Sequence, residues 1–239
     1  MKSDRAIFLL VTGVFVTGYL LGMIVDDATV IMYPTDSIGE KQVFLPAVDN
    51  YGKGVAVPVQ VEIKHGDGKV LTDIDKLLFW VDTQQSIQTA RDVASNVTGI
   101  DTSEYDLIYT IGINQSGIVG GPSAGGALTI ATIAALTNQT VKPGIMMTGT
   151  VNEDGTIGSV GGVLDKAKAA KEIGAIVLLV PIGQSKDTNS VPVQTCEKLL
   201  ELTYCTTKYQ EQTIDIGETV GITVIEIGNI QDAIKYFFE

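Results

Sequence analysis

The most pronounced hydrophobic pattern in this chain is an unbroken apolar run near its N-terminus. Residues 6–25 contain no charged side chain, and no polar face interrupts them. At 1.5 Å rise per residue, a helix of this length spans about 30 Å, the thickness of a bilayer core. A cleavable signal peptide usually has a shorter apolar stretch that ends at small residues, whereas two aspartates follow this run. The pattern therefore favours a transmembrane anchor over a cleaved signal peptide or a buried core helix.

Beyond this run, residues 28–48 look irregular, and the later patterns change between strand and helix periodicity. Apolar and polar residues alternate over 55–63, which predicts a strand that ends at the turn 65–68. Residues 86–97 have helical spacing. Further predicted strands cover 77–81, 107–113, 145–150, 175–180 and 222–227, and further predicted helices cover 124–136, 163–173, 195–202 and 230–238. Strands and helices in this mixed order predict an α/β (α+β) domain.

Length and charge indicate one exported domain on a membrane anchor. A chain of 239 residues suits one domain with an appendage. We expect a cytoplasmic tail at 1–5, the transmembrane anchor at 6–25, a linker at 26–49 and the domain at 50–239. A lysine and an arginine precede the run, so the positive-inside tendency puts the N-terminus in the cytoplasm. We therefore expect a single-pass membrane protein with its domain on the extracytoplasmic side, and three N-x-[S/T] sequons agree with export.

Composition narrows the chemistry that this domain can perform. The net charge of −12 repels phosphate backbones, so we expect no nucleic-acid partner. The one histidine, His65, falls in a predicted turn, so we expect neither a zinc site nor a Ser–His–Asp triad, and no metal or cofactor. Cys196 and Cys205 could pair outside the cytoplasm. In one continuous helix they would lie about 13 Å apart, too far for a disulfide, so the sequence leaves their pairing open.

A glycine-rich segment, Gly-Gly-Pro-Ser-Ala-Gly-Gly at 120–126, is the first candidate for chemistry. Pro122 fixes φ just before a predicted helix, and its small neighbours would let a substrate backbone come close. Ser123 would lie at the helix N-terminus, where free amides favour an oxyanion. It could equally be only an N-cap. A phosphate-binding loop is disfavoured because the Walker pattern G-x-x-x-x-G-K-[S/T] is absent.

The predicted helix 163–173 carries the second candidate, Lys166. At 100° per residue, its apolar face holds Val163, Ala167, Ala170 and Ile173, and its polar face holds Asp165, Lys168 and Glu172. Lys166 falls inside the apolar stripe. Burial lowers the pKa of a lysine, and a neutral amine is a competent base. The alternative, a buried stem whose amine reaches water, is weaker here because the other charged residues avoid this face.

Together these segments resemble the proteolytic domain of Lon proteases. Ser123 and Lys166 are 43 residues apart, as in that family. The matching motifs are Gly-Pro-Ser-Ala-Gly at 121–125, Met147-Thr148-Gly149, Gly155-x-Ile157-x-x-Val160-Gly161-Gly162-x-x-x-Lys166 and Leu-Leu-Val-Pro at 178–181. The resemblance covers about residues 50–239 and is most specific over 121–181.

The resemblance implies a catalytic dyad and a role for its neighbours. Ser123 would attack a peptide carbonyl, and Lys166 would accept its proton. Thr148 would orient the Lys166 amine, and backbone N–H groups around Gly121 and Ser123, on either side of Pro122, would form the oxyanion site. The implied fold is that of the Lon protease domain, with mixed sheets and flanking helices. Relatives assemble into rings, so the resemblance implies a homo-oligomer whose size this sequence does not specify.

Two positions depart from the family pattern, and one module is absent. Many Lon proteases have an aspartate three residues before the serine, where this chain has Gly120. Many also have an acidic residue after Met-Thr-Gly, where this chain has Thr150. Both changes leave the dyad intact and concern regulation and the geometry of the substrate site. No Walker A motif occurs, so we expect no nucleotide partner.

We therefore expect an ATP-independent, membrane-anchored serine endopeptidase that cleaves unfolded or flexible polypeptides, similar to Lon-like proteases of archaea. A dedicated processing protease with one specific target is an alternative. A catalytically silent Lon-like assembly or binding module is another. The presence of both Ser123 and Lys166 argues against the silent module, because binding requires no lysine on the core face of a helix.

Overall fold

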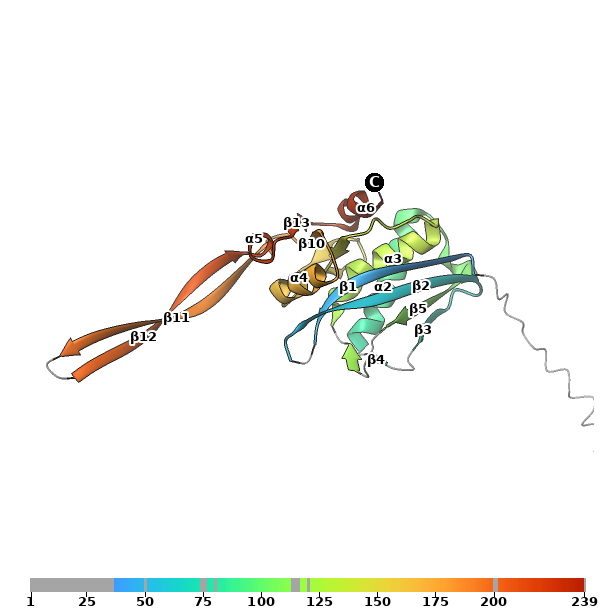
Figure 1. Ribbon diagram of the computed structural model, residues 1–239. Coiled ribbons are helices and arrows are strands. Elements are labelled where there is room, and N and C mark those ends of the chain that lie inside the picture. The colour runs from blue at the N-terminus through green and yellow to red at the C-terminus, as the bar shows by residue number, and fades with distance from the viewer. Residues whose placement is uncertain are drawn as a thin grey trace, which may run out of the picture. The chain divides into compact units, whose positions relative to one another are not determined.

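The computed structural model describes residues 37–49, 51–73, 77–79, 81–112, 117–119, 121–199 and 202–238 (Figure 1). The predicted tail at 1–5 and the predicted membrane span at 6–25 lie outside these ranges. Within them, no helix is both long and apolar enough to cross a membrane.

A four-stranded sheet forms one side of the domain core. Its strands are β1 (Gly39–Val48), β2 (Gly54–His65), β3 (Val70–Asp73) and β5 (Tyr105–Ile111), in the order β1-β2-β5-β3. Within this sheet, β2 pairs antiparallel with both β1 and β5, and β3 pairs parallel with β5. Strand β2 follows the predicted alternation, because Val57, Val59, Val61 and Ile63 are all buried.

Strand β1 corrects the expectation that residues 28–48 are irregular. Its ten residues pair with β2 along their whole length, from Gly39 opposite Ile63 to Val48 opposite Gly54. Val43 and Leu45 are buried, so one face of β1 contributes to the core. The exposed Phe44 and the proline at position 46 break the apolar–polar alternation by which a half-buried strand is recognised.

Two helices cover the buried face of this sheet. They are α2 (Val81–Thr98) and α3 (Gly125–Thr137), which contact each other, and α3 also contacts β1 and β2. Helix α3 is buried from Gly125 to Ala135, and its threonines satisfy their hydroxyls by donating to backbone carbonyls four residues earlier. A short 3₁₀ turn, η2 (Pro122–Ala124), leads directly into α3.

A second, parallel sheet contacts the remaining helices. Its strands are β7 (Ile145–Met147), β10 (Val177–Pro181) and β13 (Thr223–Ile227), in the order β13-β10-β7. The associated helices are α4 (Val163–Glu172), α5 (Ile216–Val220) and α6 (Ile230–Phe238), of which α4 also packs against β1 and β2. Successive residues of β2 divide between two hydrophobic clusters, because Val55 packs with the cluster around α3 and Ala56 with the cluster around α4. Strand β2 therefore connects the two halves of the core.

Short elements complete the core. They are β4 (Leu77–Phe79) paired with β6 (Gly117–Val119), β8 (Thr150–Val151) paired with β9 (Ile157–Gly158), and the 3₁₀ turn η1 (Thr102–Glu104). The predicted helices at 86–97, 124–136, 163–173 and 230–238 are confirmed, as are the strands predicted at 55–63, 175–180 and 222–227. The α/β class expected from the sequence is confirmed with them.

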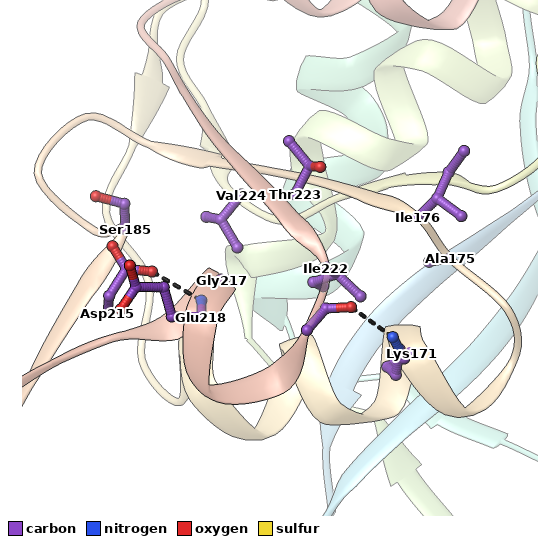
Figure 2. A pocket seen from close by; sticks show the side chains of 11 residues that line it. Lys171, Ala175, Ile176, Ser185, Asp215, Gly217, Glu218, Ile222, Thr223 and Val224 are labelled. Carbon is purple, nitrogen blue, oxygen red and sulfur yellow. Dashed lines mark hydrogen bonds between the residues drawn. The ribbon is translucent and has the colours of Figure 1, made fainter.

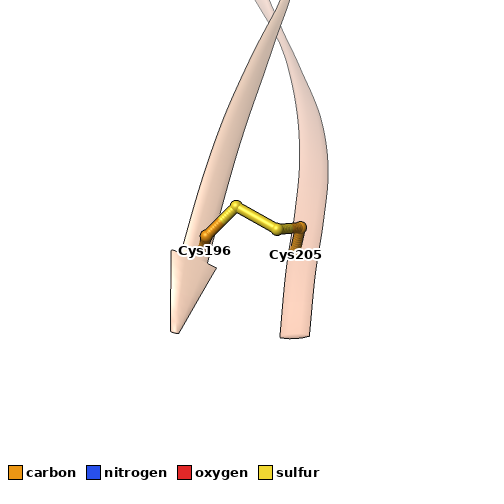
Figure 3. Close-up of a disulfide and its surroundings, with 2 residues drawn as sticks. All are labelled: Cys196 and Cys205. Carbon is orange, nitrogen blue, oxygen red and sulfur yellow. A yellow bond between two sulfur atoms is a disulfide. The ribbon is translucent and has the colours of Figure 1, made fainter. Parts of the chain in front are cut away.

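A long antiparallel hairpin replaces the helix predicted at 195–202. Its strands are β11 (Lys186–Leu199) and β12 (Leu202–Asp215), which form a sheet of their own. The register places Cys196 opposite Cys205, and the two form a disulfide across Cα atoms 4.0 Å apart (Figure 3). The helix prediction is wrong because Thr recurs on both strands, with Val on β11, and pairing between the strands overrides the local helical spacing.

Candidate active site

Helix α4 holds Lys166 in the core, as the sequence predicted. Lys166 is only 3% exposed, and the neighbouring positions Val163, Ala167 and Ala170 are buried with it. The helix begins after Gly162, whose φ of 66° lies in the left-handed region that favours glycine. The backbone of β2 comes close to this helix, because a Cβ on Gly54 would lie 1.9 Å from the Asp165 carbonyl oxygen. The buried face of α4 and its close contact with β2 therefore fix where the lysine stem enters the core.

Burial changes the acid–base behaviour of the Lys166 amine. Loss of solvation lowers the pKa of Lys166 from 10.5 to about 8, because the charged form is the one that burial disfavours. The ammonium forms no ion pair within the described part of the chain. Its hydrogen-bond partner there is the hydroxyl of Thr148, with Nζ and Oγ1 3.3 Å apart. Near neutral pH a larger fraction of this lysine is therefore neutral than of an ordinary lysine.

Thr148 links Lys166 to the segment that carries Ser123. It lies at the end of β7, is fully buried, and its amide donates to the Leu179 carbonyl oxygen at 3.0 Å. Its hydroxyl also donates a long hydrogen bond of 3.4 Å to the Ser123 carbonyl oxygen. The three residues named by the motifs are thus brought together, with Thr148 in contact with both of the others.

The backbone of β7 and the start of α3 fix the position of Ser123. Gly149 donates its amide to the Ser123 carbonyl oxygen at 3.1 Å, and Gly126 donates to the Gly149 carbonyl oxygen at 3.0 Å. A Cβ on Gly125 would lie 2.9 Å from the backbone nitrogen of Val151 in β8. The small residues after Ser123 are therefore required for the helix to approach the strand this closely.

The geometry around Ser123 does not support its interpretation as a simple N-cap. Ser123 lies inside η2, whose N-cap is Gly121, and the N-cap of α3 is Ala124. Neither helix start has a side-chain cap hydrogen bond. Ser123 itself is half-buried, and Pro122 is exposed. Gly121 has φ of 103°, a conformation that L residues rarely adopt, so the turn into this segment requires glycine.

No direct hydrogen bond joins Ser123 Oγ to Lys166 Nζ among the described residues; the connection is made through Thr148. Catalytic hydrogen bonds are often longer or absent without substrate, so this geometry remains compatible with a nucleophile and its base. Gly120, one of the two departures from the family pattern, lies outside the described residues. Thr150, the other, is half-buried at the start of β8.

A cavity beside this segment was not predicted from the sequence. It has a volume of about 710 Å³, and Pro122 and Thr150 are among the residues that line it. Three carboxylates, Asp82, Glu153 and Asp154, also line it. The only signal in the sequence is an acidic pair in the turn after Met-Thr-Gly-Thr, and nothing local indicates that Asp82 lies on the same cavity.

A second cavity of about 550 Å³ lies elsewhere, where α4 ends beside α5 and β13 (Figure 2). Lys171 lines it and donates a hydrogen bond to the Gly221 carbonyl oxygen. Ser123, Thr148 and Lys166 do not line this second cavity. Within the described ranges, no group of three or more His, Cys, Asp or Glu side chains could hold a metal ion.

Comparison with known proteins shows which family this chain resembles. The family model of the Lon protease (S16) C-terminal proteolytic domain matches residues 85–217. Lon protease 2 of Herpetosiphon aurantiacus is 32% identical over 139 residues, which cover 56% of this chain and 17% of that protein. The Lon protease of Dictyoglomus thermophilum is 30% identical over 140 residues, with the same two coverages of 56% and 17%. The Lon protease of Elusimicrobium minutum is 38% identical over 101 residues, 42% of this chain and 12% of that protein.

The match therefore spans less than a fifth of the length of these relatives. The match to the family model includes the glycine-rich segment, the Met-Thr-Gly strand end and the lysine helix, all of which lie within residues 85–217. The chain belongs to the family of the Lon protease (S16) C-terminal proteolytic domain.

Proposed function

We propose that this protein is a serine endopeptidase in which Ser123 is the nucleophile and Lys166 its general base. The observation that carries the proposal is the burial of Lys166, which lowers the pKa of its amine to about 8. A lysine with that pKa is partly neutral near physiological pH and can accept a proton from a hydroxyl. Its contact with Thr148, which in turn contacts the Ser123 backbone, gives the amine a fixed direction.

The proposed reaction has two stages. Ser123 Oγ attacks the peptide carbonyl carbon as its proton passes to the neutral Lys166 amine, and the carbonyl oxygen becomes an oxyanion. Amides at the start of a helix have no partner within it, so those of Gly121 and Ser123 would stabilise that charge. The C–N bond then breaks, and the Lys166 ammonium returns its proton to the departing amine. Water hydrolyses the acyl-enzyme in the same way, with Lys166 again as base.

Substrate binding has to bring the dyad into direct contact. In the structure Lys166 Nζ contacts Thr148 Oγ1, and we propose that Ser123 Oγ becomes a second partner of the amine when a peptide occupies the site. An amine has enough hydrogen-bonding capacity for both hydroxyls. Thr148 acts in this mechanism as a positioning residue, since it contacts Lys166 and not the reacting carbonyl.

Anchoring, orientation and independence from nucleotide are further parts of the proposal. The uncharged run at 6–25 would hold the protein in a membrane as a single-pass anchor, with the domain on the extracytoplasmic side. The proposed cleavage of unfolded or flexible polypeptides would not require ATP; residues 1–239 contain no Walker A motif. Assembly into a homo-oligomer is proposed from the resemblance alone.

Cleavage of an unfolded protein by the full chain tests the enzyme proposal. Purified protein in detergent, without nucleotide, is incubated with reduced, unstructured casein, and fragments are quantified by mass spectrometry. We expect wild type to cleave, and Ser123→Ala and Lys166→Met to reduce the rate by at least about 10³-fold. Matched controls are Ser190→Ala, in the exposed hairpin, and Lys168→Met, on the exposed face of α4. Equal cleavage by wild type and Ser123→Ala would leave the binding module as the surviving function.

A further inference from the structure

The 710 Å³ cavity is placed next to the proposed nucleophile by three segments. Its described lining comes from the first turns of α2, from η2, and from β8 with the turn that follows it. The lining residues are Asp82, Gln85, Ser86, Thr89, Pro122, Thr150, Val151, Asn152, Glu153 and Asp154. The turn η2 contacts both α2 and β8. Pro122 lines the cavity, and Ser123, which follows Pro122 in η2, is not among the lining residues, so the cavity adjoins the segment that carries the proposed nucleophile.

The charged residues around this cavity are all of one sign. Asp82, Glu153 and Asp154 are carboxylates, and no lysine, arginine or histidine is among the described lining residues. Arg91, a cation further along α2, is already held by Asp92, with Nη2 and Oδ1 2.6 Å apart. The cavity therefore presents a negative field that no described lining residue neutralises.

The three carboxylates differ in how far the protein already satisfies them. Asp154 accepts hydrogen bonds from the Thr156 amide at 2.9 Å and hydroxyl at 2.6 Å, and these lower the pKa of Asp154, so it is ionised at neutral pH. Asp82 accepts from the adjacent Thr83 amide at 2.8 Å. Glu153 is exposed and makes no hydrogen bond or ion pair within the residues that the structure describes. Glu153 is thus the carboxylate with most capacity left for a ligand.

We propose that this cavity receives a lysine or arginine side chain of the substrate, close to the scissile bond, and that Glu153 is the main residue selecting it. The inference rests on the proposed peptidase function. Pro122 and Val151 offer apolar surface for the methylene stem, and the carboxylates face the charged head. A volume of about 710 Å³ lies within the range of specific ligand pockets, about 300–1,000 Å³. An acidic substrate side chain would be repelled.

Peptide cleavage measures this preference directly. Internally quenched peptides with one cleavable bond carry Lys, Gln or Glu in turn at each of the three positions on either side of that bond. At one position we expect kcat/KM to be about fivefold higher for Lys than for Gln, the ratio that an exposed ion pair worth up to about 1 kcal/mol gives. Glu153→Gln should bring that ratio close to one, and Glu153→Lys should favour the Glu peptide. Glu172→Gln, an exposed carboxylate that does not line the cavity, should leave the ratio unchanged.

A binding measurement separates failure of this inference from failure of the proposed function. Ser123→Ala protein is titrated with fluorescent Lys and Glu peptides, and anisotropy gives Kd without any need for cleavage. Tighter binding of the Lys peptide that depends on Glu153 supports the cavity assignment even if wild type cleaves nothing. Cleavage or binding that is indifferent to charge at all six positions, or a Lys preference that Glu153→Gln leaves intact, overturns it.

Discussion

Helix α4 and the hairpin β11–β12 place side chains in opposite ways. In α4 a lysine is buried, with the hydroxyl of Thr148 as its described hydrogen-bond partner. In the hairpin, apolar and aromatic side chains such as Val193 and Tyr204 are exposed, and none of the described hairpin side chains is buried. Among the described strands, β11 and β12 pair with each other and with no third strand, and a disulfide crosses them.

The difference shows which forces hold each region. Packing of α4 holds the Lys166 amine in a buried position. Burial disfavours the charged form of a lysine and so costs free energy of folding. The hairpin has no core of its own, and two strands alone are marginally stable in water, so backbone pairing and the disulfide have to maintain it. A change in α4 should therefore reach the chemistry, and a change in the hairpin should stay local.

The largest expected effect is that of Lys166→Met, which separates activity from stability. We expect kcat to fall by at least about 10³-fold because the base is lost. At pH 7 the free energy of unfolding should rise by about 1–3 kcal/mol, because a pKa lowered from 10.5 to about 8 means that the folded protein holds the charged amine unfavourably. Kinetics with casein and urea unfolding measure the two quantities. Loss of stability with retained activity would make Lys166 a structural residue.

The pH dependence of both quantities follows from the same pKa. Below pH 8 the amine is protonated, so kcat/KM should rise about tenfold per pH unit and level off above about 8. The stability penalty is fully present below pH 8 and disappears as pH rises toward 10.5, because the unfolded chain binds the extra proton over that interval. The stability difference between Lys166→Met and wild type should therefore shrink from pH 8 to 10. An activity profile that is flat from pH 6 to 9 would contradict this assignment.

Gly54→Ala tests whether packing positions the lysine. A methyl group there would overlap the Asp165 carbonyl oxygen, so α4 has to shift. We expect a loss of about 1–3 kcal/mol in the free energy of unfolding and at least a tenfold loss in kcat, since small misplacements of catalytic groups are costly. Gly161→Ala is the matched control, because a Cβ there has open space. If both variants behave alike, close packing against β2 does not position Lys166.

The smallest effect on activity is expected from opening the hairpin. Cys196→Ser with Cys205→Ser removes the cross-strand bond, which we expect to lower the local stability of the hairpin by about 2–3 kcal/mol on the chain-entropy estimate. Hydrogen exchange should speed up in β11 and β12, while protection in α3 and α4 and the cleavage of peptides stay unchanged. Faster exchange in α4 would mean that the two regions are coupled.

The sequence predicted α4 better than the hairpin for a physical reason. The polar face of α4 is marked by Asp165, Lys168 and Glu172, so one local period was enough to place Lys166 in the core. The segment around Cys196 also has helical spacing, but its structure depends on pairing with residues further along the chain. Local periodicity carries no information about such pairing.

In the candidate site, too, one part could be predicted from local sequence and another could not. Ser123, Thr148 and Lys166 could be named from short motifs, and the structure brings them together through two hydrogen bonds. The acidic cavity could not be named, because Asp82 and Glu153 are far apart in sequence and meet only when α2 packs beside β8. A single sequence does not show which distant segments come together to line one cavity.

Labelling of Ser123 by a fluorophosphonate tests the proposed dyad most directly. The reagent bonds to activated serines with loss of fluoride, and mass spectrometry locates the adduct. We predict one adduct on Ser123, formed at a rate that rises with an apparent pKa of about 8, and no adduct in Lys166→Met. An adduct on another serine, or equal labelling of Ser123 with and without Lys166, would contradict the assignment of this pair.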